Sequence, residues 1–126
     1  MHYDLLAKMK NAYLVKKEGL RTPYSRIDHE IAKKLIKYGF LTEVTKRKSG
    51  GREYLDIRLS YENGDPLFQD FRIISKPSNH RYIGYRDLKP VMQHFGVGII
   101  STPKGILSDT EARNEQVGGE YLFQIW

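Results

Sequence analysis

The segment that most constrains the fold covers residues 99–113, Ile-Ile-Ser-Thr-Pro-Lys-Gly-Ile-Leu-Ser-Asp-Thr-Glu-Ala-Arg. Its apolar start predicts a strand over residues 97–102. Ser108, followed three residues later by Glu111, has the spacing of a capping box and predicts a helix that ends near Glu115. We therefore expect the intervening residues 101–105 to form a strand-to-helix loop, and Gly118-Gly119 to precede a last strand over residues 120–126.

Apolar periodicity and turn residues divide the rest of the chain into short elements. We predict a helix over residues 3–16, an edge strand over 20–24, and a second helix that begins after Ser25, buries Ile27, Ile31 and Leu35, and ends at Gly39. The following residues predict a hairpin of 40–48 and 52–60, a turn over 62–66, strands over 67–75 and 82–85, and a short helical or irregular segment over 86–95. This is an α+β chain, with a small N-terminal α/β domain over residues 1–63 and a C-terminal, mainly antiparallel β domain with a short helix over residues 64–126.

Charge and cysteine content narrow the function classes. The 126 residues carry a net charge of +6 and no cysteine, which excludes disulfides and thiolate metal sites and favours a reducing compartment. Residues 1–63 hold 14 Lys and Arg against 8 Asp and Glu, whereas residues 64–126 hold seven of each. A basic domain is a candidate for nucleic-acid or anionic-membrane binding. No apolar run approaches the ~20 residues that span a bilayer, so we expect no membrane partner.

The hydroxyl-rich loop is the first candidate site. Ser101 and Thr102 can exchange hydrogen bonds, Lys104 supplies a charge, and Gly105 permits close approach, a combination that suits a sugar-phosphate backbone. The same residue types also dominate ordinary turns. Gly119 either belongs to a turn or lets a ligand approach the backbone. Glu120 either accepts hydrogen bonds from RNA amino and 2′-hydroxyl groups or is simply exposed.

Two basic segments have two interpretations each. Lys76, Arg81 and Arg86 alternate with Tyr82 and Tyr85, which either stack on RNA bases or pack a strand face. Residues 46–48 with Arg52 form a basic hairpin tip that is either a solvated turn or an RNA-binding tip.

Enzyme signatures are weak. The four histidines, His2, His29, His80 and His94, lack metal-ligand spacing, and the chain has no phosphate-binding or nucleophile motif. We expect no catalytic residue, no metal and no cofactor. Two rival interpretations stay open at this point: a metal-dependent RNA-processing enzyme, and a module that binds single-stranded nucleic acid generally.

Several segments together resemble one family. They are residues 99–113, Val117-Gly118-Gly119-Glu120, residues 4–12 (Asp-Leu-Leu-Ala-Lys-Met-Lys-Asn-Ala), Pro23-Tyr24-Ser25-Arg26 and Ile74-Ser75-Lys76-Pro77. In this order and spacing, the chain resembles the bacterial small-subunit ribosomal protein S8 family over nearly its whole length. The resemblance implies a non-enzymatic constituent of the small subunit that binds the central domain of small-subunit ribosomal RNA and supports its folding and assembly. It implies neighbouring small-subunit proteins and the chain's own messenger RNA as further partners. The absence of a transit segment favours the bacterial cytoplasm over an organelle.

The resemblance also assigns residues. It implies RNA contacts by Ser101, Thr102, Lys104 and Gly105, supported by Gly119 and Glu120, with Tyr82, Lys76, Asn11 and Lys8 as further candidates. Two departures affect this surface. Pro103 stands where the family usually has Ser or Asn, and Ser78-Asn79-His80 replaces the family's usual Gly-Arg-Arg.

Overall fold

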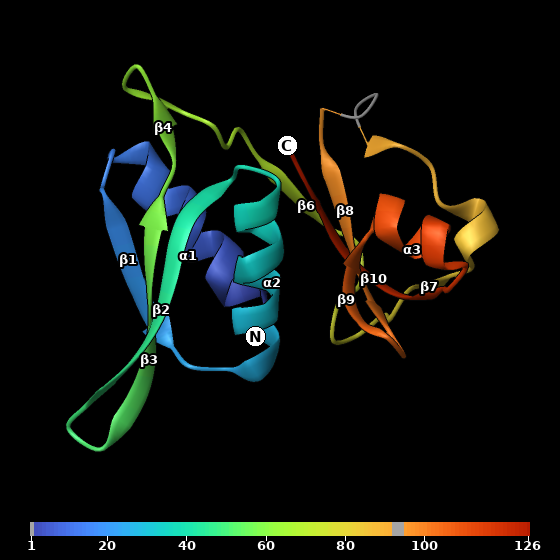
Figure 1. The fold of residues 1–126 in the computed structure, drawn as a ribbon, viewed down its shortest axis with the longest axis horizontal. Coiled ribbons are helices and arrows are strands. Elements are labelled where there is room, and N and C mark those ends of the chain that lie inside the picture. The colour runs from blue at the N-terminus through green and yellow to red at the C-terminus, as the bar shows by residue number, and fades with distance from the viewer. Residues whose placement is uncertain (1, 92–94) are drawn as a thin grey trace. The chain divides into compact units, whose positions relative to one another are not determined.

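The chain folds into two compact units, Met1–Phe68 and Gln69–Trp126. The structure is a computed structural model and describes residues 2–91 and 95–126 (Figure 1). Each unit has its own sheet and its own helices.

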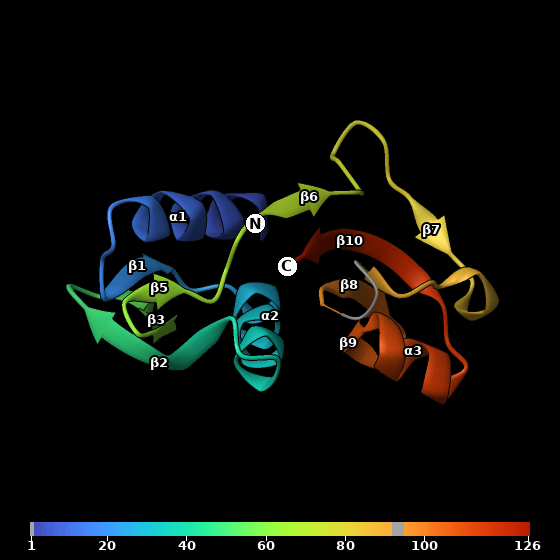
Figure 2. The ribbon, with the colours of Figure 1, turned by 90° about the horizontal axis from the view of Figure 1, so that it is seen from above.

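The first unit is a three-stranded antiparallel sheet with two helices behind one face (Figures 1 and 2). The order of its strands is β1-β3-β2. The elements are α1 (His2–Leu14), β1 (Gly19–Pro23), α2 (Arg26–Lys37), β2 (Leu41–Ser49), β3 (Arg52–Leu59), β4 (Tyr61–Glu62) and β5 (Asp65–Pro66). The predicted edge position of β1 is confirmed, and so is the hairpin of β2 and β3.

Alternation along β3 separates the two faces of this sheet. Leu55, Ile57 and Leu59 are at most 4% exposed, whereas Asp56 and Arg58 between them lie on the outer face. Two glycines close the β2–β3 hairpin, because Gly50 and Gly51 both have positive φ, which matches the twist of the flanking strands.

The second helix differs from its prediction on one side. Ser25 caps it as expected by accepting a hydrogen bond from the Asp28 backbone N–H. Its buried residues are Asp28, Ile31, Ala32 and Leu35, whereas Ile27 is 52% exposed. The prediction that Ile27 belongs to the buried stripe is wrong, because the set of residues 28, 31, 32 and 35 defines a helical face centred away from position 27.

The second unit is an antiparallel sheet around a central last strand. Its elements are β6 (Phe71–Ile73), β7 (Tyr82–Ile83), the 3₁₀ helix η1 (Tyr85–Asp87), β8 (Val97–Thr102), β9 (Gly105–Ser108), α3 (Asp109–Glu115) and β10 (Gly119–Ile125). The strand order is β6-β10-β8-β9, and β7 also pairs with β10. Under α3 lies a core of Leu88, Ile100, Ala112 and Tyr121. The predicted strand over residues 97–102 and the capping box that opens α3 are both confirmed.

Two predictions for this unit are corrected. The strand expected over residues 67–75 is reduced to β6, because Ile74 and Ser75 both donate their N–H groups to the Leu122 carbonyl at an irregularity of β10, which ends regular pairing. Residues 101–105 do not form a strand-to-helix loop, because residues 105–108 return as β9 and pair with β8. The prediction for residues 86–95 falls partly outside the described residues, which do not include His94.

Candidate nucleic-acid interface

The hydroxyl-rich segment is a tight β-hairpin whose turn is held by a threonine. Thr102 pairs with Gly105 across the hairpin, so Pro103 and Lys104 occupy the two turn positions. The Thr102 hydroxyl donates to the Gly105 carbonyl at 2.8 Å and accepts from the Lys104 N–H at 3.1 Å. Gly105 has a φ of +109°, a conformation that favours glycine. Thr102 therefore shapes this turn with its own hydroxyl.

Three strands bring three predicted residues into one row. Glu120 on β10 pairs with Ser101 on β8 and with Tyr82 on β7. Directly paired residues of antiparallel strands project from the same face of a sheet. The Tyr82 side chain is 75% exposed, so its ring is available to a ligand. Within the described part of the chain, no hydrogen bond involves the Ser101 hydroxyl.

The carboxylate of Glu120 holds the segment that precedes β7. Ser75 Oγ donates to Glu120 Oε2, and His80 Nδ1 lies 2.6 Å from the same oxygen. The Arg81 N–H in turn donates to Ser75 Oγ at 3.1 Å. Lys76 and Asn79 exchange backbone hydrogen bonds of 3.1 and 3.0 Å, which close the turn between them. Sequence reasoning missed the roles of Ser75 and His80, and no local pattern marks either residue.

The two glycines before β10 are explained by close contacts between strands. A Cβ atom on Gly119 would lie 2.0 Å from the Ser101 carbonyl oxygen, and one on Gly118 would lie 2.4 Å from the Ile83 carbonyl oxygen. Both distances are far below any van der Waals contact, and both neighbours are backbone atoms. Gly119 thus permits the pairing that places Ser101 beside Glu120. Its direct contact with a ligand stays a prediction.

Lys104 is tethered to the helix that follows. Its Nζ lies 3.1 Å from Glu115 Oε2, and both side chains are 55% exposed. The capping box fixes the start of α3, because Ser108 Oγ accepts from the Glu111 N–H at 3.1 Å and Glu111 Oε1 accepts from the Ser108 N–H at 3.0 Å. An ion pair this exposed contributes little to stability, so Lys104 can exchange Glu115 for another anion at small cost.

The remaining predicted residues, Lys8 and Asn11, lie on α1 in the first unit. Both are exposed, and the Lys8 ammonium donates to Thr22 Oγ1 at 3.2 Å. They line a hollow of about 330 Å³ that also includes Asp28, which is 3% exposed. Burial raises the pKa of the Asp28 carboxyl. The structure therefore divides the ten predicted residues: eight lie in the second unit and these two in the first.

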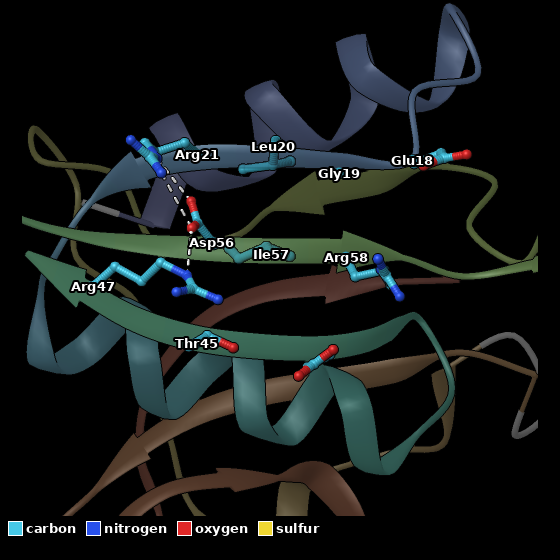
Figure 3. A pocket seen from close by; sticks show the side chains of 10 residues that line it. Glu18, Gly19, Leu20, Arg21, Thr45, Arg47, Asp56, Ile57 and Arg58 are labelled. Carbon is cyan, nitrogen blue, oxygen red and sulfur yellow. Dashed lines mark hydrogen bonds and ion pairs between the residues drawn. The ribbon is translucent and has the colours of Figure 1, made fainter. Parts of the chain in front are cut away.

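The outer face of the first unit's sheet carries an ion-pair network that sequence reasoning missed. A shallow hollow of about 490 Å³ lies there, lined by three arginines and three acidic residues (Figure 3). Asp56 accepts from Arg21 Nε at 2.7 Å and pairs with Arg47 Nε at 2.9 Å. The hydrogen bond from Arg21, together with its charge, lowers the pKa of the Asp56 carboxyl. In the basic hairpin tip, Lys46 also has an anionic partner, Glu53, at 2.8 Å.

The described residues include no group of three or more His, Cys, Asp or Glu side chains that could hold a metal ion. None of the described helices has the length and apolarity to cross a bilayer. Fold and surface together define a small two-unit α+β protein with a basic first half and, in the second unit, a row of partly exposed polar groups across three strands.

Comparison with known proteins identifies the family within that class. Residues 3–126 match the family model described as Ribosomal protein S8. Three similar relatives, each named small ribosomal subunit protein uS8, come from Persephonella marina, Thermus aquaticus and Zymomonas mobilis, at 38%, 37% and 36% identity. The matches cover 98% of this chain in each case, and 95%, 95% and 94% of the relative. The chain therefore belongs to the ribosomal protein S8 family, whose members are non-enzymatic structural constituents of the small ribosomal subunit.

Proposed function

We propose that this chain binds the central domain of small-subunit ribosomal RNA directly, through a surface on its second unit. This hairpin surface consists of Ser101 to Gly105, Glu120, Tyr82 and Lys76. The observation that carries the proposal is the row of Ser101, Glu120 and Tyr82 beside a turn held by Thr102. The row offers hydrogen-bonding groups and an exposed ring within one face of the sheet.

The chemistry of the surface fits a folded RNA helix. A-form RNA displays 2′-hydroxyls and base edges in its shallow minor groove, and proteins recognise it mostly by shape and by contacts to those groups. A rigid hairpin with the Ser101 hydroxyl is matched to such a target. The exposed Tyr82 ring suits stacking on a base that an irregular RNA helix leaves unpaired.

The first unit supplies the electrostatic part of this mechanism. Residues 1–63 carry the chain's entire excess of positive charge, which attracts RNA without regard to sequence. We propose that Lys8 and Asn11 on α1 contact the sugar-phosphate backbone of the RNA. In this scheme the positive charge of the first unit makes RNA affinity fall as the salt concentration rises. The hairpin surface distinguishes the central-domain RNA from other RNAs.

A binding comparison tests the proposal. The purified protein is titrated with a central-domain ribosomal RNA fragment and with an equal-length scrambled duplex, at two salt concentrations. We expect a preference for the fragment that persists at the higher salt. Equal and equally salt-sensitive binding to both RNAs would reduce the chain to a generic basic domain. Cleavage of labelled RNA with added Mg²⁺ would instead favour a nuclease.

A single hydroxyl variant locates the surface. Ser101→Ala removes a hydroxyl that no described residue binds, so the fold is preserved, and loss of one neutral hydrogen bond weakens binding by about 1 kcal/mol, roughly fivefold. The matched control is Thr110→Ala, which removes an exposed hydroxyl on α3. Equal affinities for Ser101→Ala and the parent chain would remove Ser101 from the interface.

The same surface would accept a messenger RNA that reproduces the shape of the ribosomal helix. The chain's own messenger RNA, added as a competitor in this titration, tests that partner. Neighbouring small-subunit proteins and a bacterial cytoplasmic ribosome complete the proposed setting.

A further inference from the structure

We propose that His80 is a positioning residue of this RNA-binding surface: together with Ser75 it holds the Glu120 carboxylate and thereby fixes residues 76–81 beside β10. The inference rests on the proposed function for its RNA readout. It concerns a residue outside the predicted contacts.

The geometry is a clamp built from three separate segments. His80 Nδ1 and Ser75 Oγ both contact Glu120 Oε2, and Ser75 Oγ also accepts from the Arg81 N–H. The carboxylate is the more enclosed partner, since the Glu120 side chain is 24% exposed and that of His80 is 53% exposed. The Arg81 carbonyl accepts from the Tyr121 N–H at 2.9 Å, which ties the end of the loop to β10. The clamp thus joins both ends of the loop to the strand that carries Glu120.

The contact between His80 and Glu120 is of a strong kind. Hydrogen bonds to a carboxylate are shorter and stronger than neutral ones, and His80 Nδ1 lies 2.6 Å from Glu120 Oε2. Lys76 and Arg81 stand at the two ends of the same loop, so the clamp fixes the backbone that carries both cations.

The first test is the RNA affinity of His80 variants. His80→Gln removes the ring that contacts Glu120, and we expect it to weaken binding of the central-domain fragment about fivefold, the scale of one lost hydrogen bond. His80→Arg places a guanidinium donor at the same position, so it should restore the parent's affinity. The control is His29→Gln in the first unit, which should keep the parent's affinity.

The second test needs no RNA. Hydrogen exchange of the Arg81 amide reports the clamp directly, because that N–H donates to Ser75 Oγ. Exchange should become faster in His80→Gln and faster still in Ser75→Ala. Parent-like affinity and parent-like exchange in His80→Gln would overturn the inference. Faster exchange in a protein that binds both RNAs equally would retain the clamp and reject the proposed function instead.

Discussion

Replacement of Gly119 by alanine is the sharpest test of how the hairpin surface is built. The added Cβ would lie 2.0 Å from the Ser101 carbonyl oxygen, 2.9 Å from its carbonyl carbon and 3.1 Å from Thr102 Cα. All three neighbours are backbone atoms of β8, so no side-chain rotation can relieve the contact. The strands must separate where Glu120 pairs with Ser101.

The size of the effect follows from that geometry. Inserting one extra carbon into packed structure costs about 1–3 kcal/mol, and a contact with backbone belongs at the upper end, about 3 kcal/mol. For a chain of this length, such a loss corresponds to a fall in Tm of roughly 10 °C. Because the separated strands carry Ser101 and Glu120, we also expect the preference for the central-domain RNA fragment to disappear.

The assay is thermal unfolding followed by RNA titration, with Gly84→Ala as the matched control. Gly84 has an ordinary extended backbone, and the nearest atom to an added Cβ is Asp87 Oδ2 at 3.8 Å, so its substitution should leave both properties unchanged. An unchanged Tm for Gly119→Ala would refute the argument from strand approach. An unchanged Tm with lost RNA affinity would show that Gly119 gives room to the ligand and not to β8.

Three further perturbations test other parts of the chain. Glu115→Gln releases Lys104 from its exposed ion pair and should tighten RNA binding roughly twofold, the scale of a surface pair; unchanged binding would place Lys104 away from the RNA. Because the pKa of Asp56 is lowered in the folded state by the hydrogen bond from Arg21, its stabilising effect is present above the ordinary carboxyl value of 3.8 and is lost as pH falls through the folded value. The urea midpoint should therefore fall less steeply below pH 4 in Asp56→Asn than in the parent; parallel curves would argue against this network. Ser108→Ala removes the buried N-cap of α3 and should cost about 1–2 kcal/mol in urea unfolding, whereas a loss within error would mean that the capping box is dispensable.

Local signals explain what the sequence predicted well. The capping box of Ser108 and Glu111 depends on residues three positions apart and forms as predicted, and the adjacent glycines Gly50 and Gly51 close the predicted hairpin. The alternating apolar residues of β3 likewise define its buried face without reference to the rest of the chain. Each of these features is determined by backbone chemistry over a few residues.

The wrong predictions arise where tertiary contacts override a local pattern. Ile27 is apolar and suitably spaced from Ile31, yet the polar Asp28 is buried instead and lines the hollow that α1 also borders. The strand expected to reach Ser75 ends early because β10 has an irregularity at Leu122, 47 residues further along the chain. The periodicity of apolar residues contains no information about either the burial of Asp28 or the irregularity of β10.

The candidate surface shows the same division at the level of single side chains. Residue types predicted a polar loop with Lys104 at its tip, but they showed neither that the loop is a β-hairpin nor which hydroxyl holds its turn. The Thr102 hydroxyl makes both hydrogen bonds of the turn, whereas the hydroxyl of the neighbouring Ser101 makes no hydrogen bond to a described residue. The sequence allows Glu120 to be a simple exposed acceptor. In the structure its carboxylate contacts Ser75 and His80, which lie 45 and 40 residues earlier in the chain. A hydroxyl or carboxylate can therefore be judged as a candidate RNA contact only when its hydrogen bonds within the protein are known. Those hydrogen bonds join strands and loops that the sequence does not show to be neighbours.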